Sequence, residues 1–190
     1  MTRFRRPYFH PLSHTGKGAM TNVPDAFPYQ IVYLGDCPEH IPLLASWHHA
    51  QWSYLSPSTT LAQRIERLRE HTGKRCVPTT FVALDDGKPA GSASLVNLDM
   101  SAREELSPWL AAVYVSPEYR RRGIGAVLVN RVVDEARALG IPTLYLYTPD
   151  KMRFYARLGW TIRETIEYRG QLMTVMQIDL RTADRDQPGA

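Results

Sequence analysis

The stretch that decides the fold is Trp109-Leu-Ala-Ala-Val-Tyr-Val-Ser-Pro-Glu-Tyr-Arg-Arg-Arg-Gly-Ile-Gly-Ala126, with the apolar-periodic segment that follows it to Leu139. Residues 109–115 are apolar and end at a Ser-Pro pair, a pattern that predicts a strand buried on both faces. From Gly125 onward, apolar residues recur at steps of three and four, which predicts a helix that stops at Gly140. Three arginines and two glycines therefore lie in a tight turn between a strand and a helix.

This basic turn has the chemistry of an anion site. The first N–H groups of a helix lack intrahelical partners, and the helix dipole is positive at that end. Glycines let a ligand approach the backbone closely, and arginines add positive charge. These features suit a pyrophosphate. On spacing alone, a solvated basic turn that caps an ordinary helix is an open alternative.

Length and composition favour one ordinary globular domain. The chain has 190 residues, 44% of them hydrophobic and 22% charged, and no apolar run approaches the ~18 residues of a membrane helix. Cys37 and Cys76 lie far apart without metal-ligand spacing, so we expect reduced thiols and a cytoplasmic protein. We predict no metal site and no contact with membranes.

Charge is concentrated at the N-terminal end. Residues 1–28 hold four basic residues and one acidic residue, which accounts for +3 of the net +4, so the rest of the chain carries only +1. A general nucleic-acid-binding face is therefore not indicated. We predict a disordered arm over residues 1–28, a single domain over 29–180 and a polar tail over 181–190.

The hydrophobic pattern predicts an α/β fold. We expect strands over 29–34, 78–84, 88–98, 109–115, 144–147, 160–168 and 171–180, and helices over 38–54, 59–71, 125–139 and 151–158. The sheet is then mixed and mostly antiparallel, with a hairpin near each end and a parallel strand–helix–strand unit in the middle. In the second helix we expect Leu61, Ile65 and Leu68 to face inward and Arg64 to face outward.

Two motifs resemble the GNAT superfamily of acyl-CoA-dependent N-acyltransferases. The turn matches the family's Arg/Gln-x-x-Gly-x-Gly/Ala loop at Arg120, Gly123 and Gly125. The segment Phe154-Tyr155-Ala156-Arg157-Leu158-Gly159-Trp160 is similar to the family's Phe-Tyr-x-x-x-Gly-Phe segment. The resemblance covers most of residues 29–180, in element order as well as in motifs. A Rossmann dinucleotide site fits poorly, because the third glycine is missing and the element order differs.

The resemblance implies an N-acetyltransferase with acetyl-CoA as co-substrate. The strand end would line the pantetheine arm, an N–H near Val113 would polarise the thioester carbonyl, and backbone N–H groups of Arg121 to Ala126 would hold the pyrophosphate. Tyr155 would protonate the departing thiolate. The acetyl-CoA-binding residues so implied are Val113, Tyr114, Val115, Arg120, Arg121, Arg122, Gly123, Ile124, Gly125 and Ala126. A primary amine, from a small molecule or a protein, would attack directly in a ternary complex.

The resemblance leaves several roles open. Tyr155 can instead be a packing tyrosine with a locally satisfied hydroxyl, which is what we expect of Tyr145 and Tyr147. The strand at 109–115 carries no carboxylate, so the general base is not identified. Three acidic residues precede this strand, and they mildly favour a cationic acceptor: Asp99, Glu104 and Glu105. Each can equally be a solvated loop charge, and water can take the amine proton. Thr148 stands where many family members have Asn, and its hydroxyl can still bind a ligand.

Aromatic and histidine residues gather on the first long helix. They are Trp47, His48, His49 and Trp52, which can shape an acceptor pocket or simply pack as core residues. Adjacent histidines point to different helix faces, which argues against a metal site. Two other functions remain as alternatives: an acyl-CoA-binding sensor without catalysis, and nucleic-acid binding through the basic arm. A homodimer and a monomer are both compatible with the sequence.

Overall fold

The computed structural model describes residues 28–181. The arm predicted for residues 1–28 and the tail predicted for 181–190 lie outside it, apart from Pro28 and Arg181. The strands are β1 (Gln30–Tyr33), β2 (Thr79–Asp85), β3 (Lys88–Val96), β4 (Trp109–Val115), β5 (Thr143–Thr148), β6 (Thr161–Tyr168) and β7 (Gln171–Asp179). The α-helices are α1 (Ile41–Trp52), α2 (Leu61–Glu70), α3 (Ile124–Ala138) and α4 (Met152–Ala156). Short 3-10 helices are η1 (Leu34–Asp36), η2 (Pro38–His40), η3 (Ser53–Leu55) and η4 (Pro117–Tyr119).

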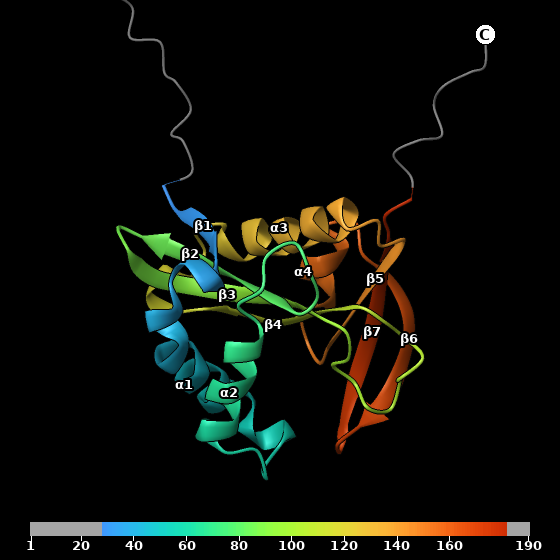
Figure 1. Ribbon diagram of the computed structural model, residues 1–190. Coiled ribbons are helices and arrows are strands. Elements are labelled where there is room, and N and C mark those ends of the chain that lie inside the picture. Colours follow the sequence, from blue (N-terminus) through green and yellow to red (C-terminus); the bar gives the residue numbers. More distant parts are fainter. Residues whose placement is uncertain (1–27, 182–190) are drawn as a thin grey trace, which may run out of the picture.

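One seven-stranded sheet organises these elements, in the order β1-β2-β3-β4-β5-β7-β6. The neighbouring strands pair antiparallel except β4 and β5, which are parallel and joined by α3. The predicted α/β fold, with its mixed and mostly antiparallel sheet, is therefore confirmed. Figure 1 shows α3 along one face of the sheet and the α1–α2 pair beneath the other.

The two faces of the sheet carry different surroundings. On the α3 face, Leu128, Val132 and Ala136 of the helix pack with apolar residues of β2 to β5 in the largest core cluster. On the α1–α2 face, Leu44 and Leu68 pack against Val82 of β2. A further apolar cluster, around Trp109, joins β4 to the β6–β7 hairpin. Side chains of β4 thus belong to different clusters according to the face they occupy.

The second helix is rotated relative to the expectation from sequence. Thr60 caps it, because its Oγ1 accepts from the Gln63 N–H while the Gln63 side chain accepts from the Thr60 N–H. Leu61, expected to face inward, is 40% exposed, whereas Arg64, expected to face outward, is half-buried. The stripe that faces the sheet contains Arg64, Leu68 and His71, spaced four and three residues apart. Ile65 and Leu68 face inward as predicted. The prediction was wrong at Leu61 and Arg64, because part of the sheet beneath this helix is polar.

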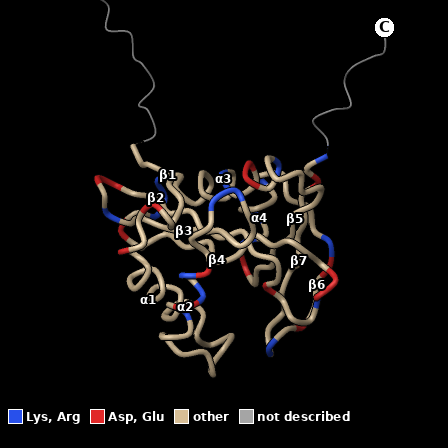
Figure 2. The backbone as a smooth tube through the Cα atoms, in the orientation of Figure 1, with Lys and Arg blue, Asp and Glu red and all other residues tan. Residues whose placement is uncertain are grey.

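Charged residues of both signs are interspersed along the described chain (Figure 2). Within residues 28–181, no helix is long and apolar enough to cross a membrane.

Candidate functional site

Strand β4 separates from β5 soon after the two strands meet. Their parallel pairing consists of Trp109 opposite Tyr145. On its other side, β4 stays paired with β3 as far as Val115 opposite Gly91. Residues 113–115 therefore have no β5 partner along one edge. This edge leaves backbone groups for a ligand to meet.

A bulge in β4 changes which side chains face each side of the sheet. Ala112 has a positive φ of 51°, and the register with β3 shifts between Ser92 and Ser94. Before the bulge, Leu110 packs in the α3-side core; after it, Val113 and Val115 do. Tyr114 then faces α1, where its ring stacks on Trp47 at 5.2 Å. The bulge thus presents Val113 and Tyr114 on opposite faces just where β4 leaves β5.

The turn between β4 and α3 has open N–H groups. Arg121 and Gly123 have positive φ values of 65° and 83°, and Gly123 precedes the first helical residue. The N–H groups of Ala126 and Val127 both donate to the Gly123 carbonyl. Those of residues 121–125 have no acceptor in the described chain. Five consecutive open donors at the positive end of a fifteen-residue helix suit a pyrophosphate.

The three arginines of this turn differ in their contacts. Arg120 Nε donates to the Val115 carbonyl at 3.0 Å and so ties the turn to the end of β4. Arg122 Nη1 donates to the Tyr29 hydroxyl at 3.4 Å, and its guanidinium lies over the Tyr119 ring. Arg121 is exposed, and its side chain has no hydrogen bond or ion pair in the described chain. Arg121 is thus the arginine whose charge is available to an anion at this turn.

The second motif lies against the first. A methyl group placed on Gly125 would lie 3.6 Å from Phe154 Cζ and 3.7 Å from Val115 Cγ2, so the turn, β4 and α4 meet at this glycine. Phe154 contacts Tyr155 edge-on, and Tyr155 contacts Trp160 in the same manner. Two segments about thirty residues apart in the sequence therefore form one structure.

Tyr155 is buried, with 9% of its surface exposed. Burial, with a smaller contribution from Asp150, raises the pKa of its phenol to about 12. The hydroxyl therefore keeps its proton at neutral pH, as a proton donor must. Tyr145 and Tyr147 instead lie on the opposite face of β5 and contact Trp109 through their rings.

Thr148 has a structural partner. Its Oγ1 accepts from the Lys151 N–H at 3.0 Å, and the residue is buried. This bond fixes the chain where it turns from β5 into α4. The hydroxyl proposed as a ligand group thus supports the helix that carries Tyr155.

Aromatic side chains line the α1 side of β4. Trp47 stacks on Tyr114, and Trp52 meets the same ring edge-on at 6.2 Å. His48 is buried between Trp52 and β3, with its Nε2 3.0 Å from Ser92 Oγ. Burial lowers the pKa of His48 to about 3, with smaller contributions from the Arg64 and His71 charges. His48 is accordingly neutral at physiological pH.

A second polar contact continues along the same face of the sheet. Thr80 Oγ1 lies 2.7 Å from Ser94 Oγ and 3.4 Å from His71 Nδ1. Burial, together with the Arg67 charge, lowers the pKa of His71 to about 4. We call these residues, together with His48 and Ser92, the polar cluster of the α1–α2 face. Its hydroxyls come from alternate positions of β2 and β3. The sequence predicted strands in these regions and gave no role to their hydroxyl groups.

The three acidic residues before β4 do not behave as a unit. Burial raises the pKa of Asp99 to about 6, against the Arg67 and Arg169 charges, which lower it. Glu105 is exposed and lies 3.8 Å from Arg103, and Glu104 is exposed as well. Of the three, Asp99 is the half-buried one, and two arginines act on it. The basis for expecting a cationic acceptor is therefore weaker than the sequence indicated.

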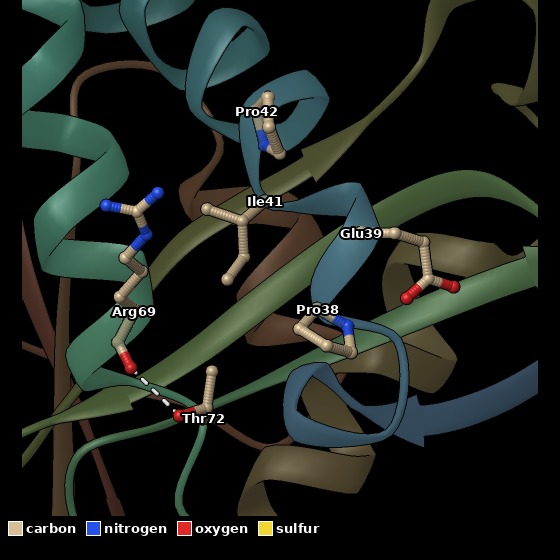
Figure 3. A pocket seen from close by; sticks show the side chains of 6 residues that line it. All are labelled: Pro38, Glu39, Ile41, Pro42, Arg69 and Thr72. Atoms are coloured by element: carbon tan, nitrogen blue, oxygen red, sulfur yellow. Dashed lines mark hydrogen bonds between the residues drawn. The ribbon is translucent and has the colours of Figure 1, made fainter.

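A surface hollow lies between the start of α1 and the end of α2. It has a volume of 350 Å³ and is lined by Pro38, Glu39, Ile41, Pro42, Arg69 and Thr72 (Figure 3). It shares no residue with the predicted acetyl-CoA site. The described residues contain no group of three or more His, Cys, Asp or Glu placed to hold a metal ion.

Comparisons with known proteins agree with this geometry. A model of the acetyltransferase (GNAT) family matches residues 41–160. The uncharacterized N-acetyltransferase MJ1207 of Methanocaldococcus jannaschii is 30% identical over 107 residues, which are 52% of this chain and 45% of that protein. The match thus spans about half the length of this curated relative.

Solved structures share the fold at low sequence identity. A ribosomal-protein-alanine N-acetyltransferase from Brucella melitensis gives a TM-score of 0.65 at 19% identity, over 79% of this chain and 99% of that one. The acetyltransferase yncA from Salmonella typhimurium, solved with its cofactor acetyl-CoA, gives 0.62 at 18% identity, over 86% and 99%. These likenesses concern the fold.

Proposed function

Since this chain belongs to the acetyltransferase (GNAT) family, we propose that it transfers the acetyl group of acetyl-CoA to a primary amine, by direct attack within a ternary complex. The observation that carries the proposal is the meeting of three parts at Gly125: the turn with open N–H groups, the diverging end of β4 and the helix that bears Tyr155. An acyl thioester on a pyrophosphate-bearing carrier would need an anion site, a strand edge for its arm and a proton donor near its sulfur, and these three parts would supply them.

The residues of this site fit acetyl-CoA. The N–H groups of residues 121–125 would hold the pyrophosphate, with Arg121 supplying charge. The free edge of β4 at residues 113–115 would pair with the amides of the pantetheine arm. When bound, acetyl-CoA supplies the activated acetyl group. This binding would place the thioester beside the β4 bulge and Tyr155.

The chain's own groups then have defined tasks. The Val113 N–H would hydrogen-bond the carbonyl oxygen as negative charge develops there. Tyr155 would hold the proton that the leaving sulfur receives. Its pKa of about 12 keeps that proton in place until transfer. A thiolate in a poorly solvated site also has a raised pKa, which brings acceptor and donor closer together.

Asp99 is the strongest candidate for the general base among the acidic residues before β4. Its pKa of about 6 leaves it ionised at neutral pH, yet basic enough to take a proton from an ammonium group or an intervening water. Burial and then the charge of Asp99 raise the pKa of Tyr147, which places Asp99 near the end of β5, the strand that leads into α4. We propose that Asp99 receives the proton that the attacking amine loses.

The direct test follows free-thiol release from acetyl-CoA with a panel of amines. We expect Tyr155→Phe to lower kcat by about a hundredfold or more, because one general acid contributes about that much. Tyr145→Phe is the matched control, since Tyr145 packs on the opposite face. Undiminished kcat in Tyr155→Phe would exclude the tyrosine as proton donor.

The same assay separates the enzyme from a sensor. A sensor would bind acetyl-CoA tightly, yet release no thiol with any amine. Loss of turnover in Tyr155→Phe with acetyl-CoA binding intact would support catalysis, because a sensor has no need of the phenol.

A further inference from the structure

Arg64 carries a positive charge into the interior without a partner. Two of its guanidinium nitrogens, Nε and Nη2, are enclosed by protein and have no hydrogen-bond acceptor in the described chain. The third, Nη1, is not enclosed in this way, and the residue as a whole is half-buried. A guanidinium has five N–H donors in a fixed fork and is always charged. Its enclosure without an acceptor costs free energy, which a bound anion would recover.

Several other arginines in the described chain have carboxylate partners. Arg69 pairs with Glu66 one turn away, and Arg103 makes two hydrogen bonds to Glu164. Within residues 28–181, the other enclosed side-chain nitrogens without partners belong to His49 and Trp160, whose side chains carry no permanent charge. Arg64 thus combines enclosure, a fixed charge and the lack of a partner.

The groups around Arg64 cannot neutralise it. Burial and then the Arg64 charge lower the pKa of His48, which is neutral. The pKa of Arg64 is itself lowered by burial and then by the charge of Arg67. Arg67 and Arg64 lie three residues apart on α2 and so project from the same side of the helix. Asp99 is an acidic group whose pKa burial raises and the Arg67 charge lowers, but no carboxylate is among the groups that shift the pKa of Arg64. The Arg64 guanidinium itself is therefore left for an anion.

This charge lies on the face of the sheet to which Tyr114 of β4 also points. His48, on which Arg64 acts, lies 3.0 Å from Ser92, and Ser92 is the β3 partner of Tyr114. Tyr114 belongs to the β4 segment predicted to bind acetyl-CoA. The α1–α2 face thus meets this β4 segment from the side opposite α3 (Figure 1).

We propose that the acceptor is an amine that also bears a carboxylate, a free amino acid, and that Arg64 binds this carboxylate. The inference rests on the proposed function, since it names the acceptor of that reaction. The planar fork of a guanidinium matches a carboxylate through two parallel hydrogen bonds. Nη1 would make the first contact, and a rotation of the side chain would turn a second nitrogen toward the ligand. The half-buried rings of Trp47 and Trp52 would then meet the amino acid's side chain.

The test compares acceptors that differ in the carboxylate. Leucine, leucinamide and 3-methylbutylamine form one set, and tyrosine, tyrosinamide and tyramine form another. For the wild type we expect kcat/KM to be about tenfold to a hundredfold higher for the amino acid than for its amide, the range that a charge-assisted hydrogen bond provides. The amide lacks the carboxylate charge and its amine is less basic, so kcat/KM is compared per concentration of neutral amine at the pH of the assay.

Arg64→Met tests the residue, and Arg69→Met is the matched control on the same helix. We expect Arg64→Met to raise KM for the amino acid and abolish its advantage over the amide, with kcat/KM for the amide unchanged. Arg64→Lys, which keeps the charge without the fork, should retain part of the preference. The melting temperature of Arg64→Met should not fall, because an unpartnered charge is removed. A wild type that prefers the amide or the amine would overturn the proposal, as would equal losses on all acceptors in Arg64→Met.

A binding measurement keeps the inference testable if no amine is acetylated. In the presence of CoA, N-acetyl-leucine should raise the melting temperature of the wild type, and N-acetyl-leucinamide should not. Arg64→Met should lose this shift while Arg69→Met keeps it. Such a result with no turnover would sustain the carboxylate site and count against the proposed reaction. Equal shifts with both compounds, or no shift with either, would overturn the site itself.

Discussion

Gly91 allows β3 and β4 to approach each other at the point where β4 enters the predicted acetyl-CoA site. A Cβ on this residue would lie 2.5 Å from the Tyr114 carbonyl oxygen, and 3.3 Å from both Val115 Cα and Leu128 Cδ1. The obstacle is backbone, which cannot move aside as the end of a flexible side chain can. Gly91→Ala must therefore displace β4 relative to β3.

The geometry gives the size of this effect. An ordinary contact begins at 3.4 Å, so the Tyr114 carbonyl must retreat by the difference, 0.9 Å. Overpacking of this kind costs about 1–3 kcal/mol, and the reduced freedom of the unfolded chain returns part of it. We expect a net loss of about 2 kcal/mol in unfolding free energy, or a fall of about 4–8 °C in melting temperature. A misplacement of about 1 Å at an active site costs up to about a hundredfold in rate.

The assay measures melting temperature and kcat/KM for acetyl-CoA in parallel. Gly87→Ala is the control, because Gly87 has a φ of 77° in the β2–β3 turn and no atom within 4 Å of the added Cβ. That variant should lose about 1 kcal/mol from backbone strain alone and keep its activity. Gly91→Ala should lose kcat/KM by about tenfold to a hundredfold. If Gly91→Ala matches Gly87→Ala in activity, the position of β4 does not matter as argued.

Two pH-dependent effects follow from Asp99 and His48. If Asp99 is the base, kcat/KM should rise with pH through about 6, where its carboxyl loses a proton. Asp99→Asn should lower the rate and remove this rise from the pH profile. A rise that persists in Asp99→Asn would exclude Asp99 as the base. Because the folded-state pKa of His48 is about 3 and the ordinary value is 6.5, the unfolded chain binds the extra proton between these values, and stability present above pH 6.5 is lost as pH falls. At pH 5 the stability lost through His48 is about 2 kcal/mol. The melting temperature of His48→Gln should therefore depend less on pH than that of the wild type. An equal dependence of melting temperature on pH in the two proteins would contradict the burial argument.

Much of the fold was predictable because its signals are local. The strand at Trp109–Val115 was predicted with the bounds that the structure gives, since an unbroken apolar run ended by Ser-Pro has few alternatives. The helix after the turn was placed within a residue of its observed start, because its apolar stripe begins at the glycine turn. The meeting of the turn with α4 followed from the family resemblance rather than from any local pattern.

The features that the sequence did not reveal depend on tertiary contacts. The bulge at Ala112 has no glycine or proline to mark it, and it arises from the pairing of β4 with β3. The rotation of α2 is another such feature, because only the folded sheet shows the polar cluster beneath the helix. Arg64 was therefore expected on the outer face. A signal did exist, since Arg64, Leu68 and His71 share one stripe, but an arginine on that stripe is more often solvated.

The most direct measurement of the central claim is hydrogen–deuterium exchange at backbone amides, with and without acetyl-CoA. The N–H groups of residues 121–125 have no acceptor in the described chain, so they should exchange rapidly in the free protein. If these N–H groups hold the pyrophosphate, acetyl-CoA should slow their exchange by about tenfold or more, together with that of residues 113–115. Tight binding of acetyl-CoA with exchange at residues 121–125 unchanged would show that the site lies elsewhere and contradict the account.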